Sequence, residues 1–433
     1  MALNHLNDPT EFKSTNYRWY VLAVLTAAHA CHALDRAIIG LMLEPIGREF
    51  GLSDNQLGLI AGPAYAVAFA CVAIPVGLAV DRFNRSRLLA LAISVWSGFT
   101  MLCGAANSMA MLAFARAAVG GAEAAGGPAG LSLISDYFRP EERSTAIGIW
   151  YSSAGVGAVA AFLGGGYIAE HYGWRFAFLA AGVPGLLIAL VILRTVGDPR
   201  SRKNLSAEKK QVTDESLLAR FALIVRVPGV IPCVIGLVLM AMVLSGFSVW
   251  VVSFLIRKYE LQIAEAGVIV GVGLGVLASV GALAAGIIVD RGRKGGIYHP
   301  QRPAVVAAII CLLSGAAGLG MVVTSSLAMT IAMLFAFGLV AAAYNGPANG
   351  LLLTIAPPHL RGLTISGLQF FTVLVGAGMG PLVVGSVSSL IGPANGIAVG
   401  LGVLCLCNVM AAISFVVAGR QASATGQIAA HPA

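Results

Sequence analysis

A charged turn occurs twice in this chain, each time at the end of a long apolar stretch. The first copy is Gly77-Leu-Ala-Val-Asp81-Arg82-Phe-Asn-Arg85, and the second is Gly286-Ile-Ile-Val-Asp290-Arg291-Gly-Arg293. Their glycines and their aspartates are both 209 residues apart in a chain of 433 residues. A repeat of this length predicts two homologous halves, and two homologous apolar halves are typical of solute carriers.

The composition places both halves in a membrane. Hydrophobic residues make up 58% of the chain and charged residues only 11%, whereas soluble domains carry about 25% charged residues. The length suffices for about twelve helices of about 20 residues each. We therefore predict an all-α membrane protein with twelve transmembrane helices in two pseudo-symmetric six-helix bundles.

The apolar stretches set the expected helices and domains. Helices are predicted over residues 19–42, 56–80, 88–106, 109–138, 143–169, 176–196, 230–256, 264–289, 303–324, 327–354, 361–389 and 393–419. The corresponding domains are a cytoplasmic segment 1–18, a first bundle 19–196, a cytoplasmic linker 197–229, a second bundle 230–419 and a disordered tail 420–433. We expect the linker to be partly helical near 207–224 and to lie at the membrane surface.

The basic residues predict the orientation. With both termini inside, 21 of the 27 lysines and arginines fall on the cytoplasmic side and four on the outer side. Such a bias marks cytoplasmic loops. We therefore expect a multi-pass protein of the cytoplasmic (inner) membrane. The net charge of +8 then reflects topology, so a nucleic-acid partner is not expected.

Four charged side chains fall deep within predicted helices: Asp35, Arg36, Arg116 and Glu123. A buried charge costs at least about 2.5–3.5 kcal/mol, so it is retained for pairing, for a polar cavity or for function. One interpretation is a static salt-bridge cluster that locks two helices together. The other is a carboxylate that exchanges a proton beside an arginine that steers it or holds an anionic substrate. Protons would then be the coupling ion.

Two histidines share the first helix with Asp35. His29, His32 and Asp35 follow one another at steps of three residues, so they face roughly one way. Histidine titrates near neutrality, which makes His32 a further candidate for proton coupling. The alternative is that each imidazole is only hydrogen-bonded in the packed helix.

Polar and aromatic residues deep in other helices are candidates for the lining of a substrate cavity. Two amides one turn apart on an apolar helix must find partners, which draws attention to Asn345 and Asn349. Together with Arg36 and Arg116, the candidates for substrate contact are Tyr65, Tyr151, Trp250, Tyr344, Asn345, Asn349 and Gln369.

The charged turns predict a cytoplasmic gate. A carboxylate where a helix leaves the bilayer accepts hydrogen bonds from a neighbouring helix N-terminus, and arginines bind helix C-termini. The alternative, anchoring by positive charge alone, explains the outlying basic residues but not the Gly-x-x-x-Asp-Arg core. The residues assigned to this gate are Gly77, Asp81, Arg82, Arg85, Arg143, Asp290 and Arg291.

Sequence motifs of other protein classes are not found. The chain has no Walker loop, dinucleotide fingerprint or nucleophile elbow, so neither an enzyme nor an ATP-driven pump is expected. Its seven cysteines show no ligand-like spacing, so we expect no disulfide framework, metal site or cofactor. We expect a monomer whose partners are the bilayer and a small-molecule or lipid substrate.

Several motifs resemble a known family. The stretch Gly77-x-x-x-Asp81-Arg82-x-x-Arg85 and the turn His171-Tyr-Gly-Trp-Arg175 resemble the major facilitator superfamily. Leu34-Asp35-Arg36, Gly121-Ala-Glu123-Ala and Gly346-Pro-x-Asn349 are similar to its spinster-type branch. The resemblance covers residues 15–420. His32 departs from it, because the branch usually has an amide there.

This resemblance implies a twelve-helix rocker-switch carrier that is often proton-coupled. In the spinster-type branch, the counterparts of Asp35 and Glu123 are the expected proton and substrate carboxylates, with Arg36 and Arg116 beside them. The implied cargo is a small organic or amphiphilic anion, either lysolipid-like or an organic acid. The alternatives are an uncoupled lipid facilitator of the scramblase type and an organic acid importer like the anion:cation symporters, which share the Asp-Arg and Glu-Ala elements.

Overall fold

The computed structural model describes residues 15–202, 217–293, 301–357 and 360–424, and these ranges contain helices and no strand. The helices of the first half are α1 (Thr15–Phe50), α2 (Asp54–Ala61), α3 (Pro63–Arg82), α4 (Arg85–Gly104), α5 (Met109–Glu123), α6 (Gly126–Tyr137), α7 (Pro140–Val159), η3 (Ala160–Gly164), α8 (Gly165–Tyr172) and α9 (Trp174–Thr195). The linker contains η4 (Pro199–Arg202) and α10 (Leu217–Arg226). The helices of the second half are α11 (Val230–Tyr259), α12 (Ile263–Val270), η5 (Gly271–Leu277), α13 (Ala278–Arg293), α14 (Gln301–Val323), α15 (Leu327–Ala341), α16 (Asn345–Ile355), α17 (Arg361–Phe371), η7 (Thr372–Ala377), α18 (Gly378–Ile391) and α19 (Gly396–Ala424).

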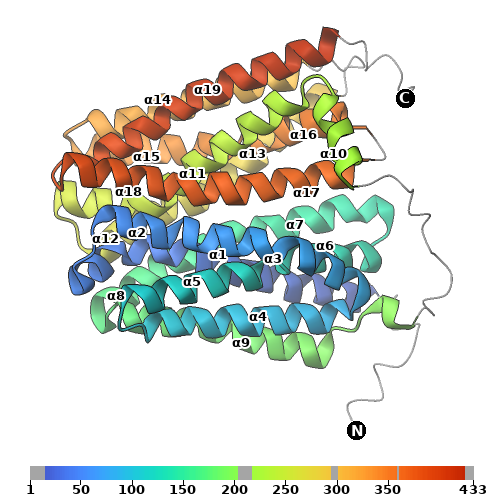
Figure 1. Ribbon diagram of the computed structural model, residues 1–433, viewed down its shortest axis with the longest axis horizontal. Helices are drawn as coiled ribbons and strands as arrows, with labels where there is room; N and C mark the ends of the chain where they lie inside the picture. Colours follow the sequence, from blue (N-terminus) through green and yellow to red (C-terminus); the bar gives the residue numbers. More distant parts are fainter. Residues whose placement is uncertain (1–14, 203–216, 294–300, 358–359, 425–433) are drawn as a thin grey trace. The chain divides into compact units, whose positions relative to one another are not determined.

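Apart from the linker helices, these elements form twelve rods, because short breaks or π-helical turns join several of them end to end (Figure 1). The twelve predicted helices are thus confirmed. Eleven rods are long and apolar enough to cross a membrane. The remaining rod joins α5 to α6 and is interrupted directly after Glu123.

The largest difference from the predicted boundaries lies at the end of α1. This helix continues to Phe50, eight residues beyond the predicted end at 42, and includes Pro45. Its polar extension has partners elsewhere in the fold, since Oε2 of Glu49 accepts hydrogen bonds from Trp174 and Arg175. In the linker, helix is present from Leu217, while residues 207–216 lie outside the described ranges.

Backbone irregularities recur at matching rods of the two halves. The fourth rod breaks between α5 and α6, and the tenth breaks between α15 and α16. The fifth and eleventh rods contain the π-helical segments η3 and η7, and the eighth contains η5 where the second breaks between α2 and α3. Segments of this kind are frequent at functional sites. The pseudo-symmetry seen in the sequence therefore extends to the breaks and π-helical segments of the backbone.

The chain divides into two compact units. Unit 1 comprises residues 1–52, 64–211 and 262–271, and unit 2 comprises residues 53–63, 212–261 and 272–433. In unit 1, α1 packs against α7 so closely that a Cβ at Gly157 would lie 2.1 Å from the carbonyl oxygen of Ala30. Only glycine permits this approach, which brings the aromatic side chains of α7 against the histidines of α1.

Unit 2 is built around a cluster of buried apolar residues from α11, α14, α16 and α19. Leu237, Met240, Leu351 and Phe415 are among its members. Many outward-facing side chains are also large and apolar, and Leu390 and Val323 are more than three-quarters exposed. A surface of this kind suits a hydrocarbon solvent rather than water.

A partly buried ion pair fixes α2 within unit 2. Asp54, in the first turn of α2, accepts hydrogen bonds of 2.7 Å from both terminal nitrogens of Arg257 on α11. It also accepts one of 2.5 Å from the hydroxyl of Ser388 on α18. A bidentate arginine–carboxylate pair is among the stronger polar contacts, so Asp54 holds three helices together.

Replacement of Asp54 by asparagine should lower the free energy of unfolding by about 2 kcal/mol, because hydrogen bonds to charged groups contribute about 1.5–3 kcal/mol. Thermal unfolding of the purified protein in detergent measures this loss. The matched control is Glu49→Gln, since Glu49 forms an exposed pair with Arg175, and such pairs contribute at most about 1 kcal/mol. Equal losses in the two variants would contradict the assignment.

Candidate proton and substrate site

Charged side chains from α1 and α5 converge in the interior of unit 1. Asp35 is on α1, and Arg116 and Glu123 are on α5. Each of these three residues is at most 2% exposed, and Arg36 on α1 is half-buried. The structure therefore brings the four predicted intramembrane charges into one compact unit.

Glu123 is the most highly coordinated of these charges. One of its oxygens, Oε2, accepts a 2.6 Å hydrogen bond from the hydroxyl of Tyr65 on α3. The same oxygen lies 2.9 Å from Nε2 of His32. The His32 contact lacks hydrogen-bond alignment, so its attraction is that of an ion pair when the imidazole is protonated. The other oxygen, Oε1, is buried and has no hydrogen-bond partner in the described structure.

Tyr65 connects the two arginines to this carboxylate. The guanidinium carbons of Arg36 and Arg116 each lie 5.4 Å from the centre of its ring, within the range of cation–π attraction. Gly120 lets α5 approach α3 here, because a Cβ at that position would lie 2.2 Å from the carbonyl oxygen of Tyr65. The Tyr65 ring is therefore held in place by contacts from α1 and α5.

Asp35 and Arg116 are neighbours without forming a side-chain ion pair. Arg116 donates its 3.3 Å hydrogen bond from Nη1 to the backbone carbonyl of Asp35. Within the described ranges, Oδ1 of Asp35 and Nε of Arg116 are both buried without a hydrogen-bond partner. The geometry thus differs from a static cluster of fully paired charges, because one acceptor and one donor atom are left without a partner among the described residues.

The histidines of α1 extend the polar cluster toward α7. Nδ1 of His29 lies 3.0 Å from the hydroxyl of Ser153, and its ring lies 4.0 Å from that of Trp150. His29 and His32 both line a cavity of about 20 Å³ that Trp96 and Trp150 complete. This volume is about that of one water molecule.

The other predicted substrate residues have varied positions. Tyr151 on α7 is 55% exposed, and its ring stands edge-on to Trp150. In unit 2, Trp250 is fully buried and donates a 2.8 Å hydrogen bond to the carbonyl of Pro381. Tyr344 is buried in the apolar cluster.

The three predicted amides are at least partly accessible. Asn345 donates to the carbonyl of Ala342, and Asn349 donates to the carbonyl of Asn345. The backbone of their own rod therefore supplies the partners that the sequence required. Gln369 on α17 is exposed. These amides belong to unit 2, whereas the four charges belong to unit 1.

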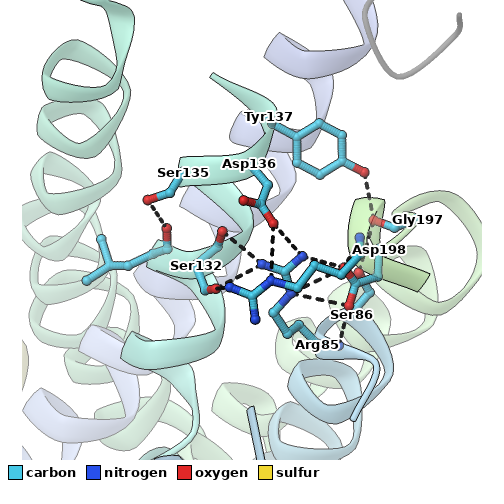
Figure 2. A network of polar contacts seen from close by, with 10 residues as sticks. Arg85, Ser86, Ser132, Ser135, Asp136, Tyr137, Gly197 and Asp198 are labelled. Carbon is cyan, nitrogen blue, oxygen red and sulfur yellow. Dashed lines mark hydrogen bonds and ion pairs between the residues drawn. The ribbon is translucent and has the colours of Figure 1, made fainter. Parts of the chain in front are cut away.

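The first charged turn is part of a buried ionic network (Figure 2). Arg85 is fully buried at the start of α4 and forms ion pairs of 2.5 Å with Asp198 and 2.7 Å with Asp136. Its Nη1 also donates to the backbone and side-chain oxygens of Ser132 on α6. Arg200 approaches Asp136 at 3.5 Å. Two arginines and two aspartates thus connect α4, α6 and the segment that follows α9.

Asp198 lies outside the membrane helices, and its ionisation depends on this network. Burial alone would raise the pKa of its carboxyl group. Hydrogen bonds from the Arg85 side chain and from the backbone N–H groups of Arg85 and Arg200 outweigh burial and lower this pKa below its usual value. The ionised carboxylate therefore stabilises the folded state at neutral pH.

The other predicted gate residues that the structure describes make fewer polar contacts than Arg85. Arg143 donates a 3.1 Å hydrogen bond to the carbonyl of Phe138 at the end of α6, as expected for an arginine near a helix C-terminus. Arg82 is exposed, and a side chain at Gly77 would meet open space. The side chains of Asp81, Asp290 and Arg291 lie outside the described part of the structure.

Sequence reasoning missed the acidic partners of Arg85. Asp136 and Asp198 are 51 and 113 residues from it in the chain, so spacing gave no signal. Their expected position on the cytoplasmic side, together with the basic turn, was the available clue. No three His, Cys, Asp or Glu side chains lie close enough to hold a metal ion in the ranges that the structure covers.

The sequence profile of the Major Facilitator Superfamily matches residues 25–381. The chain belongs to this superfamily. An MFS-type efflux pump of Mycolicibacterium smegmatis is 27% identical over 86% of this chain and 84% of that protein. A probable galactarate/D-glucarate transporter, GudP of Escherichia coli, is 25% identical over 92% of this chain and 93% of that protein.

A solved structure has the same fold as this chain. The bacterial homologue of the human lysosomal transporter Spinster, in an inward-facing and unoccupied conformation, is 27% identical with a TM-score of 0.82. The match covers 94% of this chain and 98% of that chain. The resemblance to spinster-type proteins is thus confirmed, and the chain is a multi-pass membrane transporter rather than an enzyme.

Replacement of Asp198 by asparagine should destabilise the protein at neutral pH by about 3 kcal/mol, as expected when a buried ion pair loses one partner. Because the pKa of Asp198 is lowered in the folded state, this contribution is present above the unfolded pKa of about 3.9 and is lost as the pH falls through the folded value. Melting temperatures of wild type and variant, measured from neutral to acidic pH, should therefore converge at low pH. A constant difference across that range, or none at pH 7, would exclude the ionic role.

Proposed function

We propose that this protein is a proton-coupled secondary transporter that moves an organic anion by alternating access. The observation that carries the proposal is the buried Glu123, whose Oε2 contacts both Tyr65 and His32 while its Oε1 has no hydrogen-bond partner within the described residues. An intramembrane carboxylate marks a proton or substrate pathway by default. Belonging to a superfamily of transporters supports the assignment.

The proton role rests on the incomplete pairing of the carboxylates. Asp35 and Glu123 each have a buried oxygen without a hydrogen-bond partner among the described residues. A fully ionised, unpaired carboxylate is costly in an apolar interior, and binding a proton removes that cost. His32 adds a second group that carries protons beside Glu123. The free energy of protonating the cluster would therefore change when water enters or leaves its surroundings.

The anionic cargo rests on the two arginines. Arg36 is half-buried, and among the described contacts it is stacked on Tyr65 without an ion pair to a carboxylate. Arg116 uses Nη1 on a backbone carbonyl. Protonation of Asp35 or Glu123 would leave net positive charge for an anion. The relative named as a probable galactarate/D-glucarate transporter supports a sugar acid as cargo, and the spinster-type resemblance supports anionic lysolipids.

Orientation and gating complete the proposal. In this proposal the protein is a monomer of the cytoplasmic membrane with both termini in the cytoplasm, an orientation that the bias of basic residues supports. The network around Arg85 then lies on the cytoplasmic side, where it would tie α4 to α6 while the cavity changes access. The second charged turn, at Asp290 and Arg291, is proposed as its counterpart in the other half.

Asp35→Asn and Glu123→Gln should each abolish proton-linked transport while the protein still folds. The test uses the purified protein in liposomes that contain a pH-sensitive dye, to which galactarate, glucarate and lysophosphatidylglycerol are added in turn. A substrate should move protons in wild type, and the initial rate should fall at least about 100-fold in each variant, the usual range for removal of a proton-transfer group.

The matched control is Glu49→Gln, because Glu49 is a carboxylate on the same helix but is exposed. This variant should keep the wild-type rate. Proton movement at the wild-type rate in both Asp35→Asn and Glu123→Gln would exclude their coupling role. Flux of a labelled substrate with no proton movement in wild type would support the uncoupled facilitator instead.

His32→Gln should slow proton-linked transport by about 100-fold, because the amide can contact Glu123 but cannot carry a proton. Exchange of labelled for unlabelled substrate at equal pH on both sides should continue, since it needs no net proton transfer. His171→Gln on α8, where the imidazole is exposed, is the control. If exchange falls as much as proton flux does, His32 has only a structural role.

A further inference from the structure

We propose that unit 2 binds an anionic phospholipid of the surrounding membrane in a groove between the linker helix α10 and the membrane helices α11 and α17. One acyl chain would lie in the groove, and Arg226 and Arg361 would hold the phosphate headgroup. This site is independent of the proton and substrate cluster in unit 1.

The groove is almost entirely apolar. Its volume is about 470 Å³, within the range of about 300–1,000 Å³ that is usual for ligand pockets. Only one lining residue has a polar side chain, Thr364, and its hydroxyl already donates to the carbonyl of Leu360. Several lining side chains, including Val225, Ile235 and Phe371, are about half exposed. The groove therefore has room and apolar surface for a hydrocarbon chain.

The linker helix is built to form one wall. Phe221, Ile224 and Val225 of α10 line the groove, and the Phe221 ring lies against Gly367, where a Cβ would be 3.2 Å away. A larger residue at this position on α17 would displace the ring. Leu223, which does not line the groove, is also exposed. A short helix that combines these apolar side chains with Arg220 and Arg226 suits the boundary between headgroups and acyl chains.

Two arginines border the lining segments of the groove in the sequence. Arg226 ends α10 directly after the lining residue Val225 and is exposed. Arg361 begins α17 two residues before the lining residue Leu363. Its Nε is buried and has no hydrogen-bond partner in the described ranges. An apolar groove whose lining segments adjoin an incompletely bonded guanidinium matches a molecule with a hydrocarbon tail and an anionic head.

A phospholipid fits this pattern better than a segment of the same chain. The residues that precede α10, Lys203-Asn-Leu-Ser-Ala-Glu-Lys-Lys-Gln-Val-Thr-Asp-Glu-Ser216, are mainly polar or charged. Because α11 and α17 belong to membrane-spanning rods, the groove lies within reach of acyl chains. Basic residues near a membrane surface attract anionic lipids by about 1 kcal/mol each, so the headgroup contacts should select phosphatidylglycerol over a zwitterionic lipid.

The test uses the full-length protein in phosphatidylcholine vesicles doped with phosphatidylglycerol that carries a photoreactive diazirine near the end of one acyl chain. After irradiation, mass spectrometry should find the label concentrated on peptides from α10, α11 and α17. Val234→Trp, which places an indole in the groove, should reduce this labelling to the level of other lipid-facing peptides. Ile309→Trp on α14, an exposed apolar residue outside the groove, should not.

The headgroup contacts are tested separately. Arg226→Gln and Arg361→Gln should each reduce groove labelling about fivefold, the change expected for loss of one basic residue near an anionic surface. Arg302→Gln on α14 is the control. Even labelling of all lipid-facing peptides would overturn the proposal. Equal labelling by a phosphatidylcholine probe would overturn the headgroup assignment.

Discussion

The cost of an ionised side chain in the apolar interior of a membrane governs this structure. At least about 2.5–3.5 kcal/mol per charge is enough to remove such residues from almost every helix, and the rods of the second half carry their charges only near their ends. The exceptions are concentrated in unit 1, on α1 and α5. There the arginines contact an aromatic face and a backbone carbonyl, and Glu123 contacts a tyrosine hydroxyl and an imidazole.

A charged side chain with incomplete hydrogen bonding differs in its chemistry from one in a complete ion pair. A bidentate pair such as Asp54 with Arg257 is stable because both groups stay ionised together. Glu123 differs, because its neighbours Tyr65 and His32 are hydrogen-bonding groups rather than a bidentate arginine. The same constraint therefore yields an ion pair in the first turn of α2 and a partly bonded carboxylate at the last residue of α5.

The presence of the helices could be predicted well, because an apolar stretch can be recognised without knowing which other elements pack against it. The end of α1 could not, since Glu49 continues the helix only because Trp174 and Arg175 provide partners from a distant segment. For the site, the positions of the four charged residues within apolar stretches were sufficient to identify them as candidates. They could not show that Arg116 would choose the backbone carbonyl of Asp35 over its carboxylate.

The matching irregularities of the two halves bear on the history of the protein. Breaks in the fourth and tenth rods, and π-helical segments in the fifth and eleventh, are most simply inherited from one ancestral six-helix unit that duplicated. The charges do not follow this pattern, because the break after Glu123 has its counterpart beside uncharged Asn345. The deformable backbone would then be older than the division into halves, and the charges would be a specialisation of one copy. Residues that recur in both halves would therefore report on how the fold moves, whereas residues found in one half would report on what it carries.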